Sequence, residues 1–121
     1  MVMSDLPNGK ALAKCFFINE NDKYSLNQRI CLLRPNCKIN SKYLFYKLTR
    51  NQYLLRYDDG VNQTNLKKED ILNLPILLPD ISTQNKVEKI MSNLDLKINN
   101  ELNKLYLLYN LKKGLMQNMF V

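Results

Sequence analysis

The sequence predicts an α+β fold, with short strands and helices over residues 1–79 and one long C-terminal helix of coiled-coil type over residues 80–121. Two observations carry this prediction. The first third alternates short apolar, β-compatible stretches with turn-rich ones, which is typical of strands. Beyond Pro79 the apolar residues recur at alternating spacings of three and four, which is typical of a helix packed along its length on a partner helix.

Two strands are expected near the N-terminus. Residues 11–18 are apolar and β-compatible, and a turn-rich segment follows over residues 19–22. A second strand is expected within residues 27–33, and Pro35 closes it because proline cannot donate a ladder hydrogen bond. The N-terminal region is therefore expected to contribute the strands of the fold.

The middle of the chain is expected to hold short helices. Asn40 or Ser41 is a suitable N-cap for a helix that runs to about Arg50. Three shorter elements are then expected: a helical piece over residues 53–56, a single helical turn over residues 67–72 and an extended segment over residues 74–79.

The long helix is expected to be capped by Ser82 or Thr83 and to run about 55 Å to Met119, from the rise per residue of an α-helix. A small domain cannot cover such a face along its length, and no other predicted helix is comparable. A second copy or another protein must therefore supply the partner helix. Glu101 and Lys112 occupy the remaining positions of the apolar seam. The expected interface residues are Val87, Ile90, Met91, Leu94, Ile98, Leu105, Leu108, Leu115 and Met119.

Positive charge is concentrated in the middle of the chain. The net charge is +7, and no acidic residue lies between Asp22 and Asp58 although eight basic residues do. Tyrosines and a phenylalanine are interleaved with these basic residues. Such a block attracts phosphate backbones through counterion release. The alternative is a solvated basic surface, and charge alone does not decide between the two.

The sequence contains little that is typical of an enzyme. It has no histidine, the commonest general base and zinc ligand, and only three glycines, too few for a phosphate-cradling loop. Asp80, Asp95 and Lys97 match a loose signature of metal-dependent nucleases, but Asp95 and Lys97 fall in the predicted helix rather than on adjacent strands. We therefore interpret Asp80 as a cap-region residue and expect no catalytic residue, no metal site and no cofactor.

Cysteine content and hydropathy point to the cytoplasm. Three cysteines without CxxC spacing favour small buried thiols over a disulfide framework or a metal site. No stretch approaches the apolar length needed to cross a bilayer, and the N-terminus lacks the pattern of a signal peptide. A cytoplasmic protein without membrane association is therefore expected.

Several stretches strongly resemble DNA-specificity (S) subunits of type I restriction-modification systems. In the helix and its approach these are LNLPILLP (72–79), QNKVEKIM (84–91), LDLKI (94–98) and LKKGLMQ (111–117). Upstream, residues 27–33, 43–46 and 60–66 resemble the later half of a target-recognition domain. The resemblance runs from about Gly9 onward and is more specific in the helix than before it.

The resemblance implies a scaffold rather than a catalyst. S subunits hold two target-recognition domains apart with two antiparallel spacer helices, read a bipartite DNA site, and position modification subunits that methylate adenine and restriction subunits that cleave. By this resemblance, residues 1–79 are the C-terminal part of a target-recognition domain and residues 80–121 a spacer helix. The implied partners are double-stranded DNA and the modification and restriction subunits.

Because a full subunit carries two domains and two spacers, this chain is expected to be a fragment, a truncated gene product or one piece of a split subunit. A homodimer, or pairing with a second specificity fragment through the long helix, would restore the two-fold symmetry. The alternative is a truncated interaction module that docks on modification or specificity subunits without specific DNA binding.

Candidate DNA-binding residues combine a polar loop with nearby cations. The amide and hydroxyl groups of residues 62–65 suit base edges, adenine in particular, although a solvated turn is the alternative. The cations would contact phosphates and position the protein; Arg29 is the weakest candidate because its predicted strand favours an internal pair. The candidates are Asn62, Gln63, Thr64, Asn65, Lys67, Lys68, Arg34, Lys42, Lys47, Arg50 and Arg29.

Overall fold

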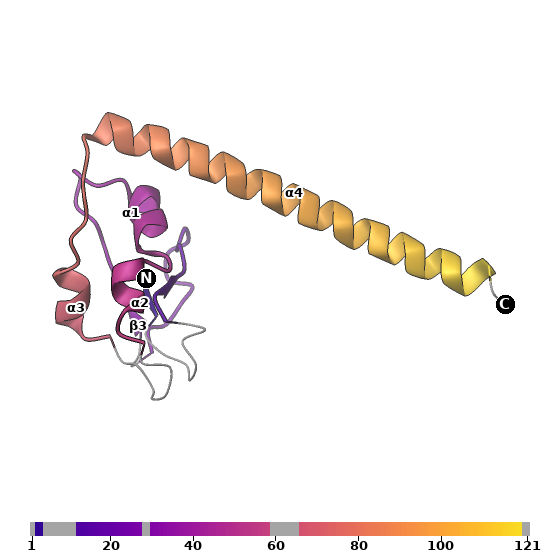
Figure 1. Ribbon diagram of the computed structural model, residues 1–121, viewed down its shortest axis with the longest axis horizontal. Coiled ribbons are helices and arrows are strands. Elements are labelled where there is room, and N and C mark those ends of the chain that lie inside the picture. The colour runs from indigo at the N-terminus through magenta and orange to yellow at the C-terminus, as the bar shows by residue number, and fades with distance from the viewer. Residues whose placement is uncertain (1, 4–11, 28–29, 59–65, 120–121) are drawn as a thin grey trace. The chain divides into compact units, whose positions relative to one another are not determined.

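The computed structural model describes residues 2–3, 12–27, 30–58 and 66–119 (Figure 1). The described elements are β1 (Val2–Met3), β2 (Lys14–Cys15), β3 (Ile30–Cys31), α1 (Ser41–Leu48), α2 (Gln52–Leu55), α3 (Lys68–Leu72) and α4 (Ile81–Met119). Short strands and helices followed by one long helix confirm the predicted α+β fold. The chain divides into two compact units, residues 1–88 (the head) and residues 89–121.

The head contains a small antiparallel sheet. Its strand order is β2-β1-β3, with Val2 of β1 paired to Cys15 on one side and to Cys31 on the other. Both predicted strands exist but are shorter than expected. Ala13 has φ 53°, a left-handed conformation that interrupts the extended stretch before Lys14. The central strand β1 was not predicted, because two residues carry no readable alternation.

The cap of α1 is confirmed as Asn40, whose Oδ1 accepts a hydrogen bond from the Tyr43 N–H at 2.9 Å. The helix ends at Leu48, and Arg50 follows with φ 52°. This left-handed residue turns the chain into α2, which begins after a second asparagine cap. Asn51 Oδ1 accepts from the Tyr53 N–H at 2.9 Å. Two asparagine caps therefore divide the predicted helical region into two helices.

The predicted helical turn over residues 67–72 is α3. The Asp70 carboxylate accepts a hydrogen bond from the Lys67 N–H at 2.7 Å, which satisfies one of the donors that the helix start leaves open. Residues 74–80 then form a connection without helix or strand, and this connection leads into α4.

The core of the head joins segments that are distant in sequence. Its buried members are leucines and one alanine, and burying each leucine stabilises the fold by about 1.5–3 kcal/mol. They come from the stretch before β2, from α1, from α2 and from both flanks of α3. The members are Leu12, Ala13, Leu48, Leu54, Leu66 and Leu74.

The start of α4 corrects one prediction. The helix begins at Ile81, and Asp80 is the capping residue rather than Ser82 or Thr83. The two Asp80 carboxylate oxygens accept hydrogen bonds from the Thr83 N–H at 3.1 Å and from the Thr83 hydroxyl at 2.6 Å. These bonds lower the pKa of Asp80. A carboxylate also interacts favourably with the positive end of the helix dipole, which a serine or threonine cap cannot do.

The cysteines agree only partly with the expectation of buried thiols. Cys15 and Cys31 are half-buried, but Cys37 is exposed, and within the described residues none of the three forms a disulfide bond. Burial raises the pKa of Cys15, so this thiol is held in its neutral form. Cys37 lies in a turn just beyond Pro35, a position that the hydrophobic pattern does not bury.

Candidate nucleic-acid surface and helix docking face

Gln84 anchors the first turn of α4 within the head. Its side chain is only 1% exposed. Oε1 accepts a hydrogen bond from the Asn40 N–H at 2.9 Å, while Nε2 donates to the carbonyl oxygens of Lys38 at 3.2 Å and Pro79 at 2.8 Å. The buried amide is therefore satisfied through both its acceptor and its two donors, as buried polar groups must be.

Two further contacts join the starts of α1 and α4. Asn40 Nδ2 donates to Asn85 Oδ1 at 2.8 Å, and Lys42 Nζ lies 3.6 Å from Glu88 Oε1. Both contacts are more exposed than the Gln84 amide and contribute less, because water competes for exposed polar groups. Sequence reasoning did not identify Gln84 as an anchor, since its partners are more than forty residues away or are backbone carbonyls.

Six of the eleven candidate DNA-binding residues lie in the described part of the chain, and all six are exposed: Arg34, Lys42, Lys47, Arg50, Lys67 and Lys68. Arg29 and the loop residues Asn62, Gln63, Thr64 and Asn65 lie outside the described residues. Whether these eleven residues bind DNA stays a prediction. The structure does show which cations already interact with the protein.

Arg50, just after α1, is hydrogen-bonded to the chain turn that precedes β2. Its backbone N–H donates to the Ala13 carbonyl at 2.8 Å, and Nη1 donates to the Leu12 carbonyl at 3.1 Å. At least one of the guanidinium N–H groups is therefore used in a hydrogen bond to the chain turn before β2.

Three cations lie over tyrosine rings in the described part of the chain, and the first is Lys23, whose Nζ is 5.8 Å from the centroid of the Tyr24 ring. Lys47 Nζ lies 5.7 Å from the centroid of the Tyr43 ring, and the Arg56 guanidinium carbon lies 4.2 Å from the centroid of the Tyr53 ring. Arg56 is one of the eight basic residues between Asp22 and Asp58 and is not among the eleven candidate DNA-binding residues. Its spacing of three residues from Tyr53 in a helix was the available signal. Stacking orders these cations without neutralising them.

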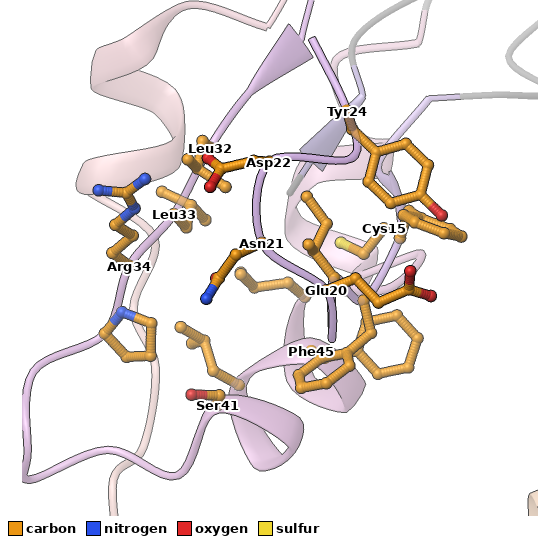
Figure 2. A pocket seen from close by; sticks show the side chains of 16 residues that line it. Cys15, Glu20, Asn21, Asp22, Tyr24, Leu32, Leu33, Arg34, Ser41 and Phe45 are labelled. Atoms are coloured by element: carbon orange, nitrogen blue, oxygen red, sulfur yellow. The ribbon is translucent and has the colours of Figure 1, made fainter. Parts of the chain in front are cut away.

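A cavity of about 560 Å³ lies in the head between residues 15–24, residues 32–35 and α1. Aromatic rings form much of its wall, with Phe16 and Tyr24 in edge-to-face contact at 5.5 Å and Phe17 and Phe45 at 5.9 Å. Arg34 lies on one side of the cavity and Tyr24 on the other (Figure 2). The lining also includes the carboxylates of Glu20 and Asp22, so the cavity combines aromatic and aliphatic side chains with charges of both signs.

The nine predicted interface residues of α4 define what we call the docking face. All nine are exposed, from 36% for Met91 to 72% for Met119. They lie on one uninterrupted helix, as Figure 1 shows. Residues 89–119 of α4 carry all of the docking face except Val87, and among the described residues their unit contains no other helix or strand.

The three residues of the nuclease-like signature, Asp80, Asp95 and Lys97, do not form one site. Asp80 caps α4, whereas Asp95 and Lys97 lie within the same helix, well beyond its first turns. In the described part of the chain no group of three His, Cys, Asp or Glu side chains is placed to hold a metal ion. None of the described helices is long and apolar enough to cross a membrane.

Comparison with known proteins identifies the family of this chain. The family model for the type I restriction modification DNA specificity domain matches residues 10–108. A putative type I restriction enzyme MjaX specificity subunit from Methanocaldococcus jannaschii is 32% identical over 96 residues, which cover 75% of this chain but 23% of that relative. No solved structure matches the chain significantly. On the extent of the family match, the chain belongs to the type I restriction modification DNA specificity domain family.

Proposed function

We propose that this chain is a non-catalytic DNA-specificity component of a type I restriction-modification complex. Its head reads part of a bipartite DNA site, and its helix docks the chain in the complex, where modification and restriction subunits are positioned for methylation and cleavage. The exposed docking face of α4 is the single observation that carries this proposal. The family match over residues 10–108 supplies the context.

The docking face calls for a partner helix. Single exposed leucines are ordinary, but a continuous apolar stripe over a helix of 39 residues marks an interaction surface. Burying one leucine or isoleucine side chain contributes about 1.5–3 kcal/mol, and the docking face holds several. The partner is a second copy of this chain or a second specificity fragment, with helices of the modification subunit as a further docking element.

The exposed cations of the head support DNA binding. Arg34, Lys47, Lys67 and Lys68 take part in no ion pair among the described residues, and the whole chain carries a net charge of +7. Cations of this kind bind phosphates, release counterions and orient a protein on the duplex. Base reading is assigned to residues 62–65, whose amides and hydroxyl match the donors and acceptors of base edges.

A specific observation also favours the alternative function, an interaction module that docks without specific DNA binding. Two of the six described candidate cations are occupied by the protein itself: Lys42 with Glu88, and Arg50 with the Leu12 carbonyl. Cations that already pair within the head are less available to bind DNA phosphates.

A gel shift at several salt concentrations separates the two functions. The full chain is mixed with a duplex that carries the target of the complex and with a scrambled duplex, each with and without modification subunits. Site-specific binding that requires or is strengthened by modification subunits supports the DNA-specificity function. Co-purification with those subunits but equal affinity for both duplexes supports the interaction module.

Sedimentation tests the pairing of copies directly. A concentration-dependent dimer of the full chain at micromolar concentration is expected, because the docking face is self-complementary in kind. A stable monomer at the same concentration contradicts the homodimer and leaves a second specificity fragment as the helix partner.

A further inference from the structure

Two charged residues interrupt the docking face at symmetric positions. Glu101 and Lys112 lie on the same face as Leu94, Ile98, Leu105, Leu108, Leu115 and Met119, at alternating spacings of four and three. Each is the same distance along the helix from the midpoint between Tyr106 and Leu107. Resting on the proposed pairing of copies, we propose that two α4 helices pair antiparallel in one register that places Glu101 of each copy opposite Lys112 of the other.

The remaining positions fit the same two-fold axis. The axis places Leu105 opposite Leu108 in the centre, Ile98 opposite Leu115 outside them, and Leu94 opposite Met119 at the ends. The paired stretch covers residues 94–119, which is about 38 Å of helix. Both charge pairs then flank a central apolar layer and are themselves flanked by apolar layers.

The two rows of residues that flank the seam, one on each side, are compatible with antiparallel packing. In that packing each row faces the same row of the partner copy. One flank carries Asp95, Leu102, Tyr109 and Met116, so Leu102 meets Tyr109 of the partner copy and Asp95 meets Met116. The other flank carries Lys97 and Lys104, which meet Asn118 and Leu111 rather than another lysine. No like charges face each other on either flank.

Other arrangements leave the seam charges uncompensated. A parallel pair in register sets Glu101 against Glu101 and Lys112 against Lys112, and like charges at an interface are repulsive. An antiparallel pair whose register is shifted by one heptad toward the head pairs a longer stretch of the two helices. It also sets Glu101 against Leu105 and Lys112 against Leu94. A shift in the other direction sets Lys112 against Leu108. Charge in the seam thus selects one register at some cost in stability, as polar seam residues do in coiled coils.

In the single chain, Glu101 pairs with Lys104 on its own helix. The two atoms Glu101 Oε1 and Lys104 Nζ are 3.5 Å apart, and the side chains are 72% and 69% exposed. Such exposed pairs contribute little, because water screens them. Lys104 therefore competes weakly with Lys112 of a second copy, and Glu101 is available to exchange partners when the helices meet.

Charge reversal in the full chain tests the pairing. Glu101→Lys and Lys112→Glu should each weaken the dimer about tenfold or more in sedimentation, since each sets two pairs of like charges together. The double variant should regain the wild-type dissociation constant. An equimolar mixture of the two single variants should form a mixed dimer, which shows that both variants fold. Lys113→Glu, beside the seam, is the matched control and should dimerise like the wild type.

Disulfide trapping tests the register. In a Cys37→Ser background, Ile98→Cys mixed with Leu115→Cys should form a cross-linked dimer, whereas Ile98→Cys mixed with Leu108→Cys reports the register shifted toward the head. A dimer that cross-links through 98 and 108, or that ignores both single charge reversals, overturns the proposed register while the proposed pairing of copies stands. A wild-type chain that remains monomeric overturns both.

Discussion

The backbone N–H of Asn40 donates to Gln84 Oε1 at 2.9 Å, so the residue that caps α1 is itself held by the first turn of α4. Asn40 thereby performs two tasks. Its side chain satisfies the Tyr43 N–H at the start of α1, and its backbone joins α1 to a buried amide of another element. Local helix capping and tertiary anchoring therefore depend on the same residue. A substitution at Gln84 is expected to destabilise the start of α1 as well as the start of α4.

Replacing Gln84 should destabilise the head. Gln84→Ala leaves the Asn40 N–H and two carbonyl oxygens without their partner, and we expect the free energy of unfolding to fall by about 2–4 kcal/mol. Urea unfolding followed by tyrosine fluorescence measures the change, since tyrosines lie in the head. Asn85→Ala is the control: its amide is exposed, and its loss should cost less than about 1 kcal/mol. Equal effects of the two variants would contradict a special role for Gln84.

Acid should weaken the start of α4 through Asp80. Hydrogen bonds from the Thr83 side chain and backbone lower the pKa of Asp80 below its ordinary value of 3.8. A carboxyl whose pKa is lower in the folded state stabilises the fold above its unfolded pKa, and this contribution is lost as the pH falls through the folded pKa. The unfolding midpoint of the wild type should therefore drop on acidification below about pH 4.

Asp80→Asn isolates this effect, because asparagine can still cap but cannot titrate. We expect its thermal unfolding midpoint to change less with pH below 4 than that of the wild type, with similar helix content at pH 7 by circular dichroism. Thr83→Ala removes the hydroxyl donor and should raise the pKa of Asp80. An acid dependence that is identical in the wild type and Asp80→Asn would show that other carboxylates are responsible.

Ala13 should tolerate glycine better than valine. Its side chain is fully buried and its φ is 53°, where a β-branched residue is strained. Ala13→Val adds this strain to overpacking, and we expect a loss of about 2–4 kcal/mol in the free energy of unfolding. Ala13→Gly relieves the backbone and should lie within about 1 kcal/mol of the wild type. Chemical denaturation of both variants provides the comparison.

Lys67 and Lys68 should contribute to DNA affinity without sequence preference. Both are exposed near the start of α3, and their side chains make no ion pair in the described structure. The double substitution by alanine should reduce the slope of log K against log salt by about two, one for each lost phosphate contact. Lys113→Ala, on α4, should leave the slope unchanged. A slope unaffected by the double substitution would place the phosphate contacts elsewhere.

Several elements could be predicted because their causes are local. The apolar seam of α4 repeats along the chain itself, and Asn40 caps a helix that begins at the next residue. The α+β class follows from the change of spacing at Pro79. The cap of α4 was placed two or three residues late, since Ser82 and Thr83 match the cap pattern as well as Asp80 does. Only the observed hydrogen bonds distinguish among three adjacent capping residues.

The candidate site was predictable in kind but not in detail. Charge distribution indicated a basic surface, and the resemblance to S subunits indicated DNA. That Arg50 binds the Leu12 and Ala13 carbonyls could not be read from sequence, because those partners lie almost forty residues earlier. The strand β1 could not be predicted either, because two residues show no alternation and the pairing that defines the strand is made with residues elsewhere in the chain.

By itself, then, the sequence determined the long helix, its apolar face with Glu101 and Lys112 in the seam, the basic character of the head and the family. These are properties of spacing and composition, which a chain has before it folds. The tertiary structure decided which polar groups are used internally: Gln84 in the anchor of α4, Arg50 in the turn before β2, and Asp80 as the cap. For Gln84 the reason is burial, because a buried donor or acceptor must find a partner. The carbonyls that the exposed Arg50 binds are distant in sequence and come within its reach only on folding, and the cap of Asp80 is fixed by its bonds to Thr83.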